Sequence, residues 1–116
     1  MTIPLPLRDL DEALAITGGS RAVADEMLRE LLAELPGQLA SAADALDAGD
    51  WDGLRSLAHR MKGSSAMCAL PALHAAVCAL QAAARAGERS QTMAEIGRAA
   101  LEHARLAASL GDGAPP

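Results

Sequence analysis

The hydrophobic positions of this chain recur with the spacing of an α-helix over most of its length. In the clearest stretch, residues 21–48, apolar side chains return every three or four residues. These positions are Val23, Met27, Leu28, Leu31, Leu32, Leu35, Leu39 and Leu46. Pro36 and Gly37 interrupt the stretch, and a proline inside a helix costs about 3 kcal/mol and usually kinks it. We therefore expect one bent helix here, with two separate helices as the alternative.

Capping residues and helix breakers divide the rest of the chain. The expected helices cover about 7–16, 21–48, 51–66, 71–86 and 91–110. Ser20, Asp50 and Ser90 stand where a side chain can cap the second, third and fifth helices. Pro71 suits the first turn of the fourth helix, where its missing N–H does no harm.

This helix pattern predicts an all-α fold. Short loops place consecutive helices side by side, so the four longer helices should form an antiparallel up-down four-helix bundle. The short first helix should pack across one end of the bundle. We expect a single domain over 1–116, ordered over about 5–110, with a flexible tail at 111–116.

Composition narrows the class of protein. Apolar residues make up 51% of the chain and are mostly Ala and Leu, both strong helix formers. The net charge of −5 argues against nucleic-acid binding. No apolar run approaches the ~18 residues of a membrane span, and the start of the chain lacks the pattern of a signal peptide. We therefore expect a soluble, cytoplasmic protein without a nucleic-acid or membrane partner.

His59 is the most informative residue of the third expected helix. With His59 at zero on a helical wheel, Leu54, Leu57 and Met61 fall within about 40° of the opposite pole. The residues that fall within about 60° of His59 include Asp52, Arg55, Lys62, Gly63 and Ala66. The imidazole should therefore face solvent, because a core histidine would require this helix to pack inside out.

The residues around His59 indicate that this histidine has a function. The alternative is an exposed surface histidine without one. Gly63 lies one turn later, and an exposed helical glycine costs about 1 kcal/mol relative to alanine. That cost is reasonable if another molecule must approach closely. Arg55, Arg60 and Lys62 create a positive field suited to a dianionic group on the imidazole. A neutral imidazole is a nucleophile that can hold a phosphoryl group on a ring nitrogen.

The sequence lacks the motifs of a kinase. It contains no Gly-rich phosphate loop for ATP and no acidic cluster for Mg²⁺. A nucleophile without such motifs indicates a carrier, with catalysis supplied by a partner.

Other candidate residues are weaker. His74 and Cys78 are four residues apart with Cys68 nearby, which could begin a Zn²⁺ site, but no fourth ligand is evident. We expect Cys78 to pack as a small hydrophobe and His74 to be partly exposed. His103 has no evident partner and should lie on the surface. A solvated rim rather than a metal site is expected at Asp44, Asp47, Asp50 and Asp52.

The run His59-Arg60-Met61-Lys62-Gly63-Ser64-Ser65 resembles the signature of the histidine-containing phosphotransfer (HPt) domain, H-x-[hydrophobic]-K-G-[S/A]-[S/A]. The similarity extends over about residues 5–110. It includes the helix with a proline in its middle and the segment 69–73, which is similar to C-terminal HPt domains of hybrid sensor kinases.

The resemblance implies a role for each residue of the motif. His59 would be phosphorylated, Lys62 would contact the phosphoryl oxygens, and Gly63 would admit the partner. Ser64 and Ser65 would be small packing residues that face the bundle. The receiver-docking face would also include Arg55, Arg60 and Ala66.

The resemblance also implies a function in bacterial two-component signalling. The chain would be a monomeric phosphoryl carrier, not an enzyme, in a multistep phosphorelay. Its partners would be response-regulator receiver domains, a hybrid sensor histidine kinase, or both. The receiver would supply Mg²⁺, so the chain needs no cofactor of its own. A scaffold or inhibitor that docks the same partners without phosphorylation is the alternative. The direction of transfer and the question of a free-standing protein or an excised domain stay open.

Three positions depart from the family pattern. Ala69 stands where the family usually has glycine, and Cys68 where leucine is frequent. Both lie in the corner after the third helix, so they affect loop geometry more than chemistry. Gln81 replaces a common acidic residue, and we expect this to change only the surface of the fourth helix.

Overall fold

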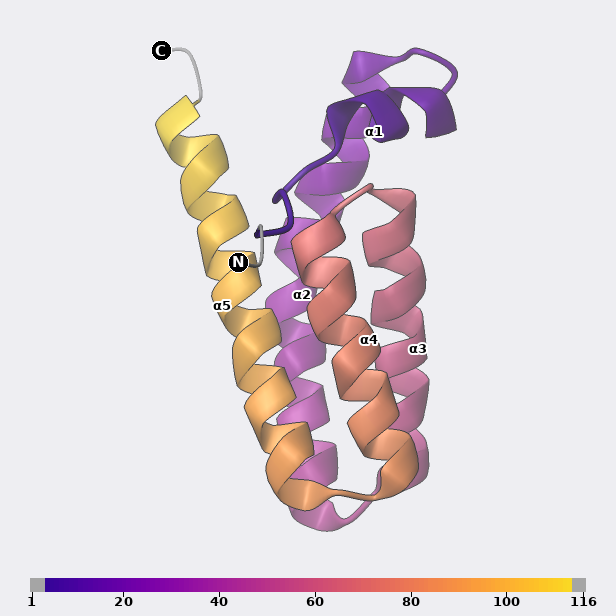
Figure 1. The fold of residues 1–116 in the computed structure, drawn as a ribbon, viewed down its shortest axis with the longest axis vertical. Helices are drawn as coiled ribbons and strands as arrows, with labels where there is room; N and C mark the ends of the chain where they lie inside the picture. Colours follow the sequence, from indigo (N-terminus) through magenta and orange to yellow (C-terminus); the bar gives the residue numbers. More distant parts are fainter. Residues whose placement is uncertain (1–3, 114–116) are drawn as a thin grey trace.

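The computed structural model describes residues 4–113, with side chains up to residue 110. Within that range the chain is all-helical, with five helices and no strand, so the predicted all-α class is confirmed (Figure 1). The helices are α1 (Leu10–Ile16), α2 (Arg21–Ala48), α3 (Trp51–Met67), α4 (Pro71–Ala86) and α5 (Arg89–Gly113). Helices α2 and α4 each pack against both α3 and α5. None of the described helices is long and apolar enough to cross a membrane.

Local capping explains most of the helix boundaries. The N–H of Val23 donates to the Ser20 hydroxyl (3.2 Å), as predicted. The N–H of Gly53 donates to the Asp50 carboxylate (2.9 Å), which confirms the second cap. The first helix begins three residues later than expected, at Leu10, because Asp9 caps it.

The predicted cap at Ser90 is wrong. Helix α5 begins at Arg89, and Ser90 lies inside it. The Glu88 carbonyl accepts both the N–H of Thr92 (2.9 Å) and its hydroxyl (2.6 Å). At its other end α5 continues to Gly113, three residues beyond the expected end at 110, while the flexibility expected at 111–116 stays a prediction. Residues 114–116 lie outside the described residues.

Helix α2 runs through Pro36 without a break, so the alternative of two separate helices is wrong. Proline has no N–H, and the Leu32 carbonyl therefore lacks its usual partner four residues later. The Nε2 atom of His103 on α5 lies 2.9 Å from this oxygen. Because the carbonyl only accepts, Nε2 must carry the proton. The expectation that His103 is a surface residue without a partner is therefore wrong.

Leucine and alanine build most of the core. The largest group of buried residues lies along all four long helices and includes Leu28, Leu35, Met61, Leu73, Val77, Leu80, Ala99 and Leu106. Gln81 is also buried, with 5% of its surface exposed. The expectation that Gln81 changes only the surface of α4 is therefore wrong.

The α3–α4 corner keeps a left-handed residue without glycine. Ala69 has a φ of 56°, and it is the position where the resemblance expects glycine. This conformation costs an alanine about 1–2 kcal/mol. The Ala69 carbonyl accepts the N–H of Asp9 (2.9 Å), and the residue packs in a small cluster with Ala13 and Ala24. These contacts offset the strain and hold the start of α1 at this end of the molecule (Figure 1).

Candidate functional site

His59 lies on the outer face of α3. Leu54 and Met61 from the same helix are buried, with 0% and 1% of their surface exposed, whereas His59 is exposed. This orientation is the one that the helical wheel predicted. The His59 side chain is therefore accessible to another molecule.

The space beside His59 is open at Gly63. A Cβ atom built at Gly63 would have no atom within 4 Å apart from those of its chain neighbours and its own helix backbone. Ala66, one turn further along, is exposed. Lys62 is half-buried and forms no ion pair with any residue that the structure describes. The structure therefore brings His59, Lys62, Gly63 and Ala66 to one continuous surface of α3.

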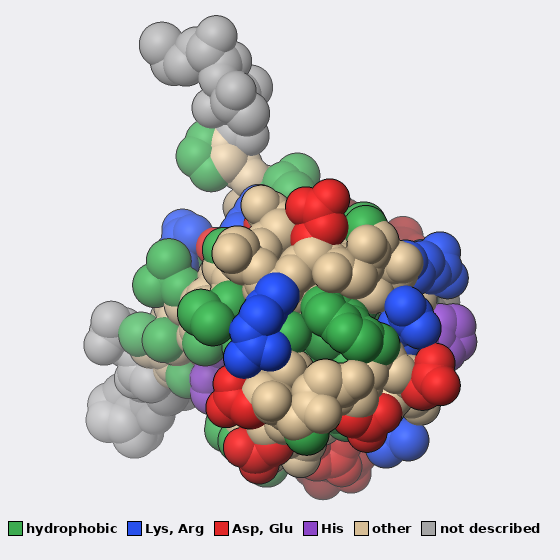
Figure 2. Space-filling view, turned by 90° about the horizontal axis from the view of Figure 1, so that it is seen from below, with side chains coloured by type: hydrophobic (Ala, Val, Ile, Leu, Met, Phe, Trp, Pro, Cys, Tyr) green, Lys and Arg blue, Asp and Glu red, His purple; other side chains and the backbone are tan. Residues whose placement is uncertain are grey.

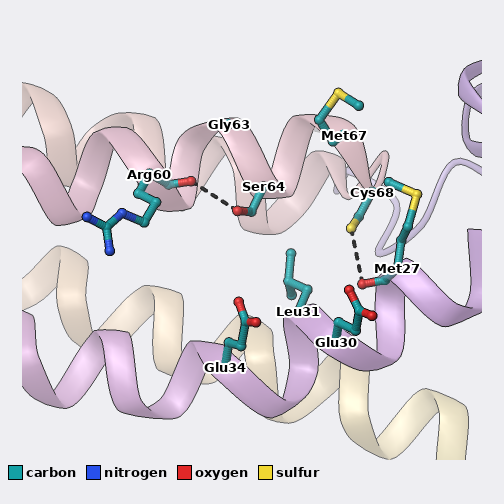
Figure 3. A pocket seen from close by; sticks show the side chains of 9 residues that line it. All are labelled: Met27, Glu30, Leu31, Glu34, Arg60, Gly63, Ser64, Met67 and Cys68. Atoms are coloured by element: carbon teal, nitrogen blue, oxygen red, sulfur yellow. Dashed lines mark hydrogen bonds between the residues drawn. The ribbon is translucent and has the colours of Figure 1, made fainter.

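The two arginines of this helix point to different neighbours. Arg55 donates from Nε to the Ala84 carbonyl at the end of α4 (3.3 Å) and pairs through Nη1 with Asp52 (3.1 Å). Arg60 is exposed and faces α2 across a groove (Figure 3). Because Asp52 offsets the charge of Arg55, the positive field expected around His59 comes mainly from Lys62 and Arg60.

A groove of about 450 Å³ lies between α2 and α3 and reaches Gly63 (Figure 3). Helix α2 contributes Met27, Glu30, Leu31 and Glu34, and the α3 side contributes Arg60, Gly63, Ser64, Met67 and Cys68. None of these α2 residues was predicted to be part of the site. One signal was present, because Glu30 and Glu34 are four residues apart and thus share a face of one helix.

The two serines of the motif lie in different environments. Ser65 is fully buried and donates to the Lys62 carbonyl (3.0 Å), so it faces the bundle as the resemblance implied. Ser64 is half-buried, lines the groove and donates to the Arg60 carbonyl (3.1 Å). The expectation that both serines are packing residues is therefore right for Ser65 only.

A chain of hydrogen bonds supports the motif from behind. Ser65 Oγ lies 3.1 Å from Nδ1 of His74, and its single proton is given to the Lys62 carbonyl. Nδ1 must then donate, which leaves Nε2 to accept the Cys78 thiol (3.4 Å). His74 and Cys78 are both half-buried, so Cys78 is less enclosed than we expected. These hydrogen bonds link α4 to the backbone of α3, the helix that carries His59.

The third residue of the imagined Zn²⁺ site points elsewhere. The buried Cys68 thiol donates to the Met27 carbonyl on α2 (3.6 Å), and burial raises its pKa. Among the described residues, no group of three or more His, Cys, Asp or Glu side chains is placed to hold a metal ion.

The aspartates expected to form a solvated rim are all exposed. Asp47 pairs with Arg89 (3.4 Å), while Asp52 and Asp50 have the contacts described above. Figure 2 looks onto the end of the molecule opposite α1, where acidic side chains are spread around the rim.

Comparison with known proteins identifies the family. The family model described as "Hpt domain" matches residues 26–109, which include the whole of α3 and α4 and most of α2 and α5. No curated protein and no solved structure matches the chain. Hpt domains are phosphotransfer carriers rather than kinases, and they act with receiver domains and kinases in phosphorelays. Since the match covers most of its length and contains His59, the chain belongs to the Hpt domain family.

Proposed function

We propose that this protein accepts a phosphoryl group on His59 from an aspartate of a receiver domain and passes it to another receiver. One observation carries the proposal. The exposed imidazole is followed one turn later by Gly63, where a side chain would meet only open space. A receiver can therefore bring its phosphorylated aspartate close to the ring.

The chemistry needs only an accessible nucleophile on this side. The lone pair of a neutral imidazole nitrogen forms the P–N bond while the P–O bond to the aspartate breaks, and the carboxylate keeps the bonding electrons. Transfer to the next receiver reverses these changes. We assign to Lys62 the role of offsetting charge on the phosphoryl oxygens. The partner receiver would provide Mg²⁺, and this chain would supply no cofactor.

The connections between the long helices indicate how these helices are arranged. Short connections join Ala48 to Trp51, Met67 to Pro71 and Ala86 to Arg89. We infer that α2 to α5 alternate in direction as an antiparallel up-down bundle, because such connections leave little room for a crossover. We also propose that the protein works as a monomer in the cytoplasm of a bacterium, with receiver domains or a hybrid kinase as partners.

Uptake of label from phosphorylated receivers tests the proposal. Receiver domains from the same genome are charged with radiolabelled acetyl phosphate, purified and mixed with the wild type, His59→Gln or His103→Gln. The last variant is the matched control, because its amide can still donate to the Leu32 carbonyl. We expect label on the wild type and on the control, and none on His59→Gln. Label on His59→Gln equal to the wild type, or none on the wild type with any receiver, would refute the proposal.

Replacement of Lys62 tests its assigned role. Loss of a hydrogen bond to a charged group costs about 1.5–3 kcal/mol, so Lys62→Ala should slow transfer by roughly tenfold or more. Lys62→Arg keeps the charge but changes its shape, and it should recover part of the rate. Transfer assays quenched at successive times give the transfer rate and the lifetime of phosphohistidine. If Lys62→Ala changes neither quantity, the role of Lys62 is wrong.

A further inference from the structure

Three charged side chains line the groove beside Gly63 without an ion pair among the described residues. They are Glu30 and Glu34 on α2, and Arg60 on α3. All three are exposed. In Figure 3 the two carboxylates rise from α2 on one side of the groove, and Arg60 lies on the other.

Charged residues next to the groove behave differently. Glu26 pairs with Arg29 on α2 (2.9 Å), and Asp52 pairs with Arg55 on α3 (3.1 Å). These charges are satisfied within their own helices. The groove therefore leaves Glu30, Glu34 and Arg60 open for a partner, whereas these two neighbouring pairs are already neutralised.

The spacing of the two glutamates lowers the stability of the isolated protein. Like charges four residues apart on a helix destabilise it by about 0.2–0.5 kcal/mol. Glu30 and Glu34 have this spacing and no cation of the described chain between them. A lysine or arginine from a docked partner would remove that repulsion and gain two attractive interactions.

Apolar side chains also line the groove. Leu31 is buried at the base of the groove, Met27 is half-buried, and Met67 has 54% of its surface exposed. Methionine is flexible and adapts its shape to different partners. The groove can therefore receive an apolar side chain between an acidic side and a basic side.

We propose that Glu30 and Glu34 select which receiver docks on this protein. The favoured receiver presents an apolar side chain to the groove, with lysine or arginine on the side of α2 and a carboxylate on the side of Arg60. This inference rests on the proposed function, since it concerns the partner that reaches His59. The groove reaches Gly63, one turn from His59, so we expect a receiver placed over His59 to extend onto the two glutamates.

Complementary charges act chiefly on the rate of association. They raise it by about 10- to 1,000-fold, and the gain falls steeply with ionic strength. Reversal of both glutamates should therefore slow transfer from a matching receiver by at least roughly tenfold at low salt. The same change should speed transfer from receivers that carry acidic residues at the corresponding place.

The experiment measures transfer from a panel of purified receiver domains charged with acetyl phosphate. The test variant is Glu30→Lys/Glu34→Lys. The control is Asp44→Lys/Glu88→Lys, which changes the net charge equally at two exposed positions outside the groove. Circular dichroism checks that both variants keep their helices. We expect the test variant to lose rapid transfer from the receiver that is fastest with the wild type. The control should keep that transfer rate within about twofold of the wild type.

Rescue and salt dependence complete the test. A receiver whose basic docking residues are changed to glutamate should recover transfer to the test variant. High salt should slow the wild type more than Glu30→Gln/Glu34→Gln. If the test variant and the wild type show the same receiver preference, the inference fails although His59 is still labelled. If the control loses transfer equally, only net charge matters and the inference also fails. If the wild type takes no label from any receiver, the proposed function fails with it.

Discussion

Substitutions of Gly63 can separate the stability of the protein from the access of a receiver to His59. The residue lies inside α3, and a Cβ atom there would meet nothing within 4 Å. Alanine is favoured over glycine by about 0.8–1.0 kcal/mol in a helix interior, and leucine is nearly as favourable as alanine. Both Gly63→Ala and Gly63→Leu should therefore stabilise the isolated protein by about 1 kcal/mol. For a chain of this length the melting temperature should rise by roughly 4 °C.

The two variants should differ in phosphoryl transfer. A methyl group projects little beyond the backbone, so Gly63→Ala should transfer at close to the wild-type rate. A leucine side chain fills the space that the docked receiver must occupy. Overpacking typically costs about 1–3 kcal/mol, which corresponds to a roughly 5- to 150-fold slower transfer.

Thermal unfolding and transfer from one charged receiver provide both quantities for the three proteins. The combination that supports the account is a stabilised Gly63→Leu variant that transfers slowly. A stabilised Gly63→Leu variant that transfers as fast as the wild type would show that access at Gly63 does not matter. Destabilisation of Gly63→Ala would contradict the open geometry of this surface.

Two further predictions concern the bundle. His103→Ala leaves the Leu32 carbonyl unpaired and should cost about 1–3 kcal/mol, but at least about 1 kcal/mol less in a Pro36→Ala background, where the helix regains an N–H. Equal costs in urea unfolding of both backgrounds would refute this coupling. The pKa of Asp25 is lowered mainly by Arg8, whose Nη2 lies 2.9 Å from the carboxylate. Asp25→Asn should therefore cost about 1 kcal/mol near neutral pH, and the difference from the wild type should shrink as the pH falls below about 3.9 and vanish once the pH is below the lowered pKa. A difference that persists at about pH 2 would contradict the ion pair.

Helix starts were predictable where the signal lies within a few residues. Ser20 and Asp50 each accept an N–H three residues later, so the sequence alone identifies these caps. Ser90 has the same chemistry but does not cap α5. Arg89, the first residue of α5, donates to the Leu46 carbonyl at the end of α2 (2.7 Å). That contact joins residues 43 positions apart, and no local pattern reveals it.

The role of His103 illustrates a similar limit. Pro36 indicates that a carbonyl in α2 loses its partner, and this much can be read from the sequence. Which side chain replaces that partner depends on how α5 lies against α2. Ala69 shows the converse, because a missing glycine suggested an altered corner. The surrounding contacts hold the alanine in the left-handed conformation instead.

Only the part of the candidate site that lies on α3 could be predicted from the sequence. The exposure of His59 and Gly63 depends on the periodicity of one helix, and the wheel gave it correctly. The groove depends on the relative placement of α2 and α3, which sets Glu30 and Glu34 across from Arg60. A single sequence does not contain that information in a local pattern.

The most direct test of the account locates the phosphoryl group after transfer. The protein is incubated with a receiver domain charged with acetyl phosphate, digested under mildly basic conditions and analysed by tandem mass spectrometry. The account predicts a phosphoryl group on His59 that is labile in acid and stable in base. A phosphoryl group on another residue, such as His74, or none while the receiver stays competent to phosphorylate a known Hpt domain, would contradict it.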